Sequence, residues 1–328
     1  MSGQEPRAHS RRGQGGGEVV PPAEFTSYYG RPVVKPAPWG PDIPAYLFTG
    51  GLAAGSSLLA AGADLTGRHG LRRVTRLVAL GGISASLVAL IHDLGRPARF
   101  LNMLRTFKVT SPMSVGTWIL TLYGPPAGLA AAAEVAQALP LPDQWVRRAQ
   151  LAGRAAGLAA GLTAPPVAAY TAVLLADTAT PSWHDAYRQL PLVFVASAAA
   201  AAGGAGMTGA PVAEASPARR LGAGGAVIEL VAERVMERAM GLTAEPLRTG
   251  RAGRLMRAAR ALSVIGAAGS LLARRSRAAA VVSGVALTTA SALTRFGIVE
   301  AGKASARDPR YTVVPQRERL ASGGRAGG

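Results

Sequence analysis

Apolar stretches of about 20 residues follow one another along most of the chain, and few folds can accommodate this pattern. A helix of about 20 apolar residues crosses the hydrocarbon core of a bilayer. Segments containing Arg, Pro or Asp separate eight such stretches, which cover residues 43–63, 74–91, 112–134, 155–176, 190–209, 222–241, 256–273 and 278–297. The pattern predicts an all-α integral membrane protein with eight transmembrane helices.

The composition also favours a membrane protein. Of the 328 residues, 49% are hydrophobic and only 16% are charged, whereas about 25% is usual in soluble domains. A net charge of +18 would suggest nucleic-acid binding in a soluble protein, but here the Arg clusters lie between the apolar stretches. We therefore expect a lipid membrane and a protein partner, and no nucleic acid. A soluble basic nucleic-acid binder would lack the apolar stretches.

The chain divides into three parts by composition. Residues 1–42 are rich in Gly, Pro and charge and predict a disordered or extended arm, residues 43–300 form the membrane domain, and residues 301–328 form a polar tail. The stretch 222–241 is the least apolar. Its Glu229, Glu233 and Glu237 share one helical face, which would look into protein or headgroups. An interfacial helix is the alternative for this stretch.

An even number of spans places both termini on one face of the membrane. That face carries 24 of the 36 Lys and Arg residues. The positive-inside rule then predicts that the terminal face is cytoplasmic and that the chain is a multi-pass protein of the cell (inner or cytoplasmic) membrane.

The residues available for redox chemistry are few. The chain has no Cys, and its four His, at positions 9, 69, 92 and 184, all lie outside the centres of the apolar stretches. Buried haems and iron–sulfur clusters need such ligands. We therefore expect no haem, cluster or metal site in this chain, so that any redox centre is a bound organic molecule or belongs to another subunit.

The densest polar motif follows the second stretch. His92 and Asp93 lie at the predicted membrane edge, where such a pair can relay protons. Gly95 and Pro97 then end the helix, and Ser111 caps the next one. The loop between them carries four cations that would dock a partner: Arg96, Arg99, Arg105 and Lys108. The alternative is a helix cap with snorkelling arginines.

The predicted topology gathers further polar side chains into the layer of His92 and Asp93. Tyr46 and Thr49 in the first stretch and Tyr170 in the fourth lie at similar depths. Hydroxyl donors in a lipid-accessible pocket suit the two carbonyl oxygens of a quinone. The alternative for each Tyr is an aromatic anchor at the membrane interface.

The segment from His92 to Leu120, HDLGRPARFLNMLRTFKVTSPMSVGTWIL, resembles the signature of NrfD-type membrane subunits, relatives of the polysulfide reductase membrane anchor. Further similarity lies in residues 170–176, 181–183, 190–194 and 293–297, and the resemblance covers about residues 43–315. In the polysulfide reductase relative, Asn and His side chains of the first helix contribute to the quinone site. The first stretch here offers Tyr46 and Thr49 instead.

The resemblance implies eight helices in two four-helix bundles, without haem or cluster. It further implies a subunit that exchanges electrons between the quinone/quinol pool and a peripheral ferredoxin-like subunit with [4Fe–4S] clusters, commonly joined to a molybdopterin catalytic subunit. Such a chain completes no redox reaction alone. The alternative function is a non-redox membrane anchor or small-solute transporter, in which Pro165 and Pro166 would break a helix around a substrate.

Overall fold

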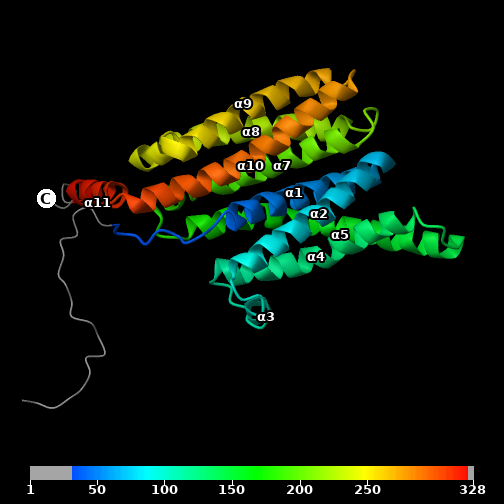
Figure 1. The fold of residues 1–328 in the computed structure, drawn as a ribbon, viewed down its shortest axis with the longest axis horizontal. Coiled ribbons are helices and arrows are strands. Elements are labelled where there is room, and N and C mark those ends of the chain that lie inside the picture. Colours follow the sequence, from blue (N-terminus) through cyan, green and yellow to red (C-terminus); the bar gives the residue numbers. More distant parts are fainter. Residues whose placement is uncertain (1–31, 324–328) are drawn as a thin grey trace, which may run out of the picture.

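The computed structural model of the protein describes residues 32–323, and this part of the chain contains helices and no strands (Figure 1). The long helices lie side by side along one direction. In chain order the elements are α1 (Asp42–Leu65), α2 (His69–Asp93), α3 (Arg99–Leu104), α4 (Pro112–Ala136), α5 (Asp143–Ala176), α6 (Pro181–Asp185), α7 (Leu190–Gly209), α8 (Ser216–Met240), the 3₁₀ helix η1 (Gly241–Leu247), α9 (Gly250–Leu272), α10 (Arg277–Arg307) and α11 (Arg310–Gly323).

Six helices of the described region are long and apolar enough to cross a membrane: α1, α2, α5, α7, α9 and α10. The prediction of an all-α protein with several such helices is therefore confirmed. Helices also form over the third and sixth apolar stretches, as α4 and α8, but these two are not among the six. Pro125 and Pro126 lower the hydropathy of α4, and the charged residues of α8 lower that of α8. Six candidate spans are thus found among the described residues, and the predicted number of eight is not confirmed.

The helices pack as two sets that share a seam. Helices α1, α2, α4 and α5 pack against one another, as do α7, α8, α9 and α10, while α1 and α5 also contact α7. At the seam, a Cβ on Gly55 would overlap the Ala198 carbonyl and the Ala202 side chain of α7. A residue without a side chain is therefore needed for this close helix approach, and Gly51 and Gly55 have the GxxxG spacing typical of such contacts. The division into two four-helix bundles stays a prediction, because α1 packs in both directions.

The acidic face of α8 lies inside the protein. Glu229 and Glu233 are each 1% exposed, and Glu233 accepts a hydrogen bond of 2.9 Å from Arg260 of α9. Glu237 pairs with Arg248 at 2.8 Å and with Arg260. Because α8 packs against α7 and α9, its acidic face looks into protein, and the alternative of an interfacial helix does not describe it.

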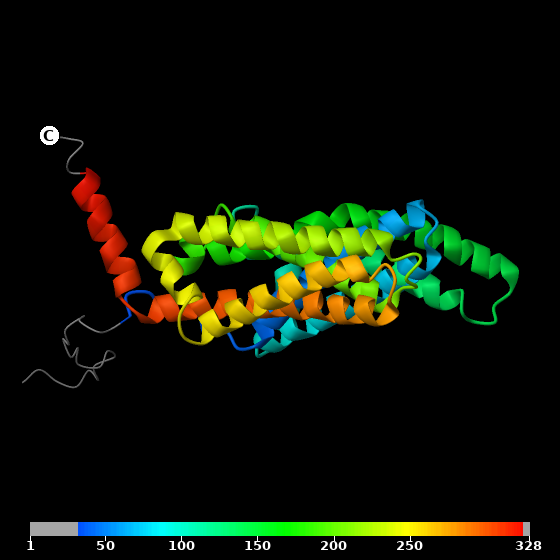
Figure 2. The same cartoon turned by 90° about the horizontal axis from the view of Figure 1, so that it is seen from above.

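An aromatic stack holds the two ends of the described region together. Trp39 stacks on Trp183 of α6 with ring centroids 5.3 Å apart, and Lys303 of α10 donates to the Trp39 carbonyl at 2.9 Å. The Trp183 indole donates to the Ile298 carbonyl of α10 at 2.8 Å. Both described ends therefore lie at the same end of the molecule, as predicted for the termini, and α11 extends from that end (Figure 2).

Helices and packed residues of the described region lie on both sides of the predicted domain boundaries, and the division into three parts stays a prediction. Most of the predicted arm, residues 1–31, lies outside the described residues, whereas Ala37 and Trp39 pack against the core. At the other end, α10 continues past residue 300 to Arg307, with Ala301 and Ala306 buried. The polar tail then begins as the separate helix α11.

We expect Gly302→Ala to lower the melting temperature of the detergent-solubilised protein. A Cβ on Gly302 would overlap the Trp183 indole, and overpacking a core costs about 1–3 kcal/mol. The matched control is Gly224→Ala in α8, where a Cβ meets nothing within 4 Å and the helix propensity improves. Thermal unfolding followed by tryptophan fluorescence would test this, and equal melting temperatures for the two variants would contradict the packing argument.

Candidate functional site

A small apolar cavity lies between α1, α2, α4 and α5, near the end of the molecule that carries Trp39. Its volume is about 70 Å³. Tyr46, Asp93, Thr117 and Tyr170 supply side-chain polar groups to its lining, and most of the other lining residues are apolar. The full lining is Trp39, Ile43, Tyr46, Leu90, Asp93, Leu94, Met103, Met113, Gly116, Thr117, Leu120, Tyr170 and Leu174.

The two tyrosines of the cavity meet through their hydroxyls. Tyr46 of α1 and Tyr170 of α5 are 124 residues apart in sequence, yet their hydroxyl oxygens are hydrogen-bonded to each other. Both side chains are nearly buried, at 5% and 8% exposed. One hydroxyl proton is used in this bond, so the other remains for a ligand that enters the cavity.

Neighbouring helices fix the positions of both rings. A Cβ on Gly116 of α4 would overlap the Tyr170 ring, so the absence of a side chain at residue 116 makes room for it. Ser86 of α2 donates to the Tyr46 carbonyl at 3.1 Å, which ties α2 to α1 beside the cavity. About three turns beyond Tyr46 along α1, the Ser57 hydroxyl lies 2.8 Å from the Tyr123 hydroxyl of α4.

The structure separates the predicted proton-relay pair. Asp93 is partly buried and lines the cavity, whereas the His92 side chain is 78% exposed and its Nδ1 lies 3.0 Å from Oδ2 of Asp42. His92 and Asp42 form a surface pair beside the cavity, and only Asp93 borders the cavity itself. The relay role of both residues stays a prediction.

Thr49 does not line the cavity. Its hydroxyl donates to the Ala45 carbonyl one turn earlier in α1, at 2.8 Å. Such bonding to the preceding turn is common for Thr in helices. A second cavity, of about 460 Å³, lies between the end of α5, α6 and α11 and is lined by Asp177 and His184 among others. Of the polar residues expected in one layer, the structure therefore brings Tyr46, Asp93 and Tyr170 together.

The four predicted docking cations all lie in the connection between α2 and α4, and all are exposed. Among the described residues, no hydrogen bond or ion pair is made by the side chains of these four residues, Arg96, Arg99, Arg105 and Lys108. The connection has defined ends. Gly95 adopts φ +65° just after α2, and the Ser111 hydroxyl caps α4 by accepting from the Ser114 amide at 3.4 Å. The predicted helix stop and start are both confirmed.

The sequence reasoning missed several residues of the cavity: Trp39, Met103, Gly116 and Thr117. Trp39 lies in the segment interpreted as an arm, and Met103 lies in the short helix α3 within the cationic loop. Only Gly116 and Thr117 could have been predicted from the sequence. They lie in the first two turns of α4 after its Ser-Pro start and therefore at the depth of Asp93.

The cavity is smaller than the sites that hold most small molecules, which measure about 300–1,000 Å³. Entry of a ring-sized ligand therefore requires lining side chains to move. Met103 and Met113 are the candidates, because Met113 is 53% exposed and methionine side chains repack readily.

Comparison with known proteins identifies one family. The family model described as polysulphide reductase, NrfD matches residues 33–218, which contain every element that lines the cavity. A search of the curated proteins found no match.

Proposed function

The chain belongs to the polysulphide reductase NrfD family of membrane proteins, and from that premise we propose that it is the quinone-interacting subunit of an oxidoreductase complex. In this proposal the cavity between α1, α2, α4 and α5 takes up a quinol or quinone from the lipid. The pair of hydroxyls on Tyr46 and Tyr170 is the observation that carries the proposal, because these are the donors that a quinone oxygen needs in an otherwise apolar site.

The proposed reaction separates protons from electrons. Oxidation of a quinol to a quinone releases two electrons and two protons, and reduction takes up both. Tyr170 and Tyr46 would hold the quinone oxygen through the free hydroxyl proton of their pair. Asp93, which lines the same cavity, would accept or deliver protons, with His92 and Asp42 as the exposed pair that exchanges them with water.

The electrons would leave to another subunit, since this chain has no cysteine to hold a cluster. We propose that a ferredoxin-like subunit with [4Fe–4S] clusters docks on the connection between α2 and α4. Four exposed cations lie there, and the same connection contributes Met103 and Leu94 to the cavity. We also propose that a molybdopterin catalytic subunit joins this complex and that the chain lies in the cell membrane.

The transporter alternative has less support. It depends on a helix broken at Pro165 and Pro166, but α5 runs as one helix from Asp143 to Ala176 through both prolines. A non-redox anchor is distinguished by activity, because oxidation of a reduced quinone by the purified complex would exclude it.

Tyr170→Phe is expected to reduce quinol-dependent turnover several-fold and to leave expression unchanged. The substitution removes one hydroxyl and keeps the ring that packs on α4, and one hydrogen bond is worth about 0.5–1.5 kcal/mol. The matched control is Tyr187→Phe, whose hydroxyl contacts Arg188 at the surface. If Tyr170→Phe and Tyr46→Phe both turn over like wild type, the quinone site lies elsewhere.

Gly116→Ala should reduce the same activity by at least as much as Tyr170→Phe. The added Cβ displaces the Tyr170 ring from its place against α4 and so moves the hydroxyl pair. Gly124→Ala, in the same helix with nothing within 4 Å of the new Cβ, serves as the control and should be silent. Equal turnover by the two variants would argue against a role for the position of Tyr170.

The double variant Arg96→Glu/Arg99→Glu is expected to weaken association with the iron–sulfur subunit while membrane insertion stays intact. Both side chains are exposed and unpaired within the described residues, so reversing them changes the charge of the docking surface alone. Pull-down from mild detergent at increasing salt would measure this. A complex yield that matches wild type at every salt concentration would remove the docking role.

A further inference from the structure

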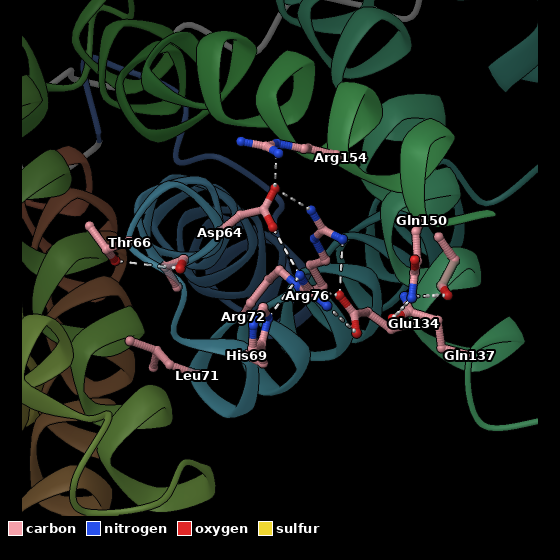
Figure 3. Close-up of polar contacts among 12 residues, drawn as sticks. Asp64, Thr66, His69, Leu71, Arg72, Arg76, Glu134, Gln137, Gln150 and Arg154 are labelled. Atoms are coloured by element: carbon pink, nitrogen blue, oxygen red, sulfur yellow. Dashed lines mark hydrogen bonds and ion pairs between the residues drawn. The ribbon is translucent and has the colours of Figure 1, made fainter. Parts of the chain in front are cut away.

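A second polar site lies at the end of the molecule opposite Trp39, where α1 ends, α2 begins, α4 ends and α5 enters the bundle (Figure 3). Arg72 of α2 contacts Asp64 of α1 at 2.9 Å and Glu134 of α4 at 2.7 Å. Arg76, one turn further along α2, contacts the same two carboxylates at 3.4 and 2.9 Å. Four charged side chains from three helices thus form one closed network.

This network is balanced and largely removed from water. Asp64, Arg76 and Glu134 are 6%, 3% and 4% exposed, and Arg72 is 13% exposed. Two guanidinium groups therefore neutralise two buried carboxylates. The Nε atom of Arg76, however, is buried and has no hydrogen-bond partner among the described residues. A buried donor of this kind is costly to leave unpaired.

Further cations surround the network without further acids. A cavity of about 680 Å³ opens beside it, lined by Asp64, His69, Arg72, Arg76, Gln137, Arg147, Gln150, Leu151 and Arg154. Arg154 is 62% exposed and lies 3.9 Å from Asp64, a carboxylate already shared by two arginines. Arg147 has no ion pair or side-chain hydrogen bond among the described residues. Four guanidinium groups thus face a cavity whose nearby carboxylates, Asp64 and Glu134, are already paired.

We expect the cavity to lie at the depth of lipid headgroups, from the length of α5. Helix α5 has 34 residues and is therefore about 51 Å long, whereas the hydrocarbon core is about 30 Å thick. Its first turns, with Arg147, extend past the ends of α1 and α2 (Figure 1). The mouth of the cavity also includes Leu151, which is 72% exposed, so an apolar surface adjoins the cationic one.

We propose that this cavity binds a phosphate group, supplied either by an anionic phospholipid or as free phosphate. Guanidinium groups bind phosphate oxygens through paired N–H donors, and several of them converge here on a volume that admits such a group. The surplus of two positive charges selects an anion. The site is separate from the proposed quinone cavity and does not depend on it.

The test uses the full chain in mild detergent with the subunits that accompany it. Three probes are titrated while the melting temperature is recorded: dioleoylphosphatidylglycerol, dioleoylphosphatidylcholine and inorganic phosphate. The variant is Arg147→Gln/Arg154→Gln, which keeps the buried network of four charges. The control is Arg148→Gln/Arg275→Gln, two exposed arginines at the same end of the molecule that do not line the cavity.

We expect a saturable rise in melting temperature with phosphatidylglycerol, with inorganic phosphate or with both, and a half-saturating concentration about tenfold higher in the variant but not in the control. A response to the lipid alone identifies a headgroup site, and a response to inorganic phosphate identifies a site for the free ion. Rises of equal size with phosphatidylglycerol and phosphatidylcholine, no response to either phosphatidylglycerol or inorganic phosphate, or equal affinities for variant and control would overturn the proposal. Should the variant fail to fold, Gln150→Glu places a carboxylate on the rim and is expected to weaken binding in the same way.

Discussion

The close approach of α1 to α7 determines much of the remaining arrangement. Gly55 allows the two helices to meet at a distance that no side chain would permit, and α1 consequently lies at the centre of the molecule, in contact with α2, α5, α7 and α10. Helices in lipid gain little from burying apolar surface, so such tight packing is a main source of their association. Because α1 is central, its two ends define both sites: Tyr46 reaches the cavity at one end and Asp64 the charged network at the other.

The cost of burying charge constrains the charged side chains in both sets of helices. An isolated charge in a membrane protein costs several kcal/mol, so charged side chains face the interior and pair there. Asp64, Arg72, Arg76 and Glu134 do so in the first set, and Glu233, Glu237 and Arg260 in the second. Pairing accounts for Glu233 and Glu237 of the internal helix α8, whereas the buried Glu229 has no hydrogen-bond partner among the described residues. Beside Asp64, the exposed Arg147 and Arg154 add positive charge to the cavity lining without further acids.

The sequence was informative wherever one segment determines its own structure. Apolar length located the long helices, Ser111 and Gly95 located their ends, and the four-residue spacing of Glu229, Glu233 and Glu237 predicted a shared helical face. The depth argument also brought Tyr46 and Tyr170 together correctly.

Contacts between distant segments could not be predicted in this way. His92 contacts Asp42, which lies 50 residues earlier in the sequence, and does not line the cavity that its neighbour Asp93 borders. Trp39 reaches the cavity from a segment whose composition resembles a linker, because its ring is held by Trp183, far along the chain. The spacing of residues along one helix contains no information about such partners. Thr49 differs from these residues, because its position was mispredicted for a local reason. Its hydroxyl bonds to the preceding turn of its own helix, which any Thr within a helix can do.

The stacked indoles of Trp39 and Trp183 are fluorescent groups beside the cavity, and their emission depends on how they are stacked. Trp39 lines the cavity, while Trp183 is buried against Gly302 and bonded to the Ile298 carbonyl. A ligand that moved Trp39 would separate the two indoles or shift α6 and α10 with them, so binding of such a ligand would be coupled thermodynamically to α6 and α10. Emission from this indole pair would therefore change with occupancy, without an added label and before any electron is transferred.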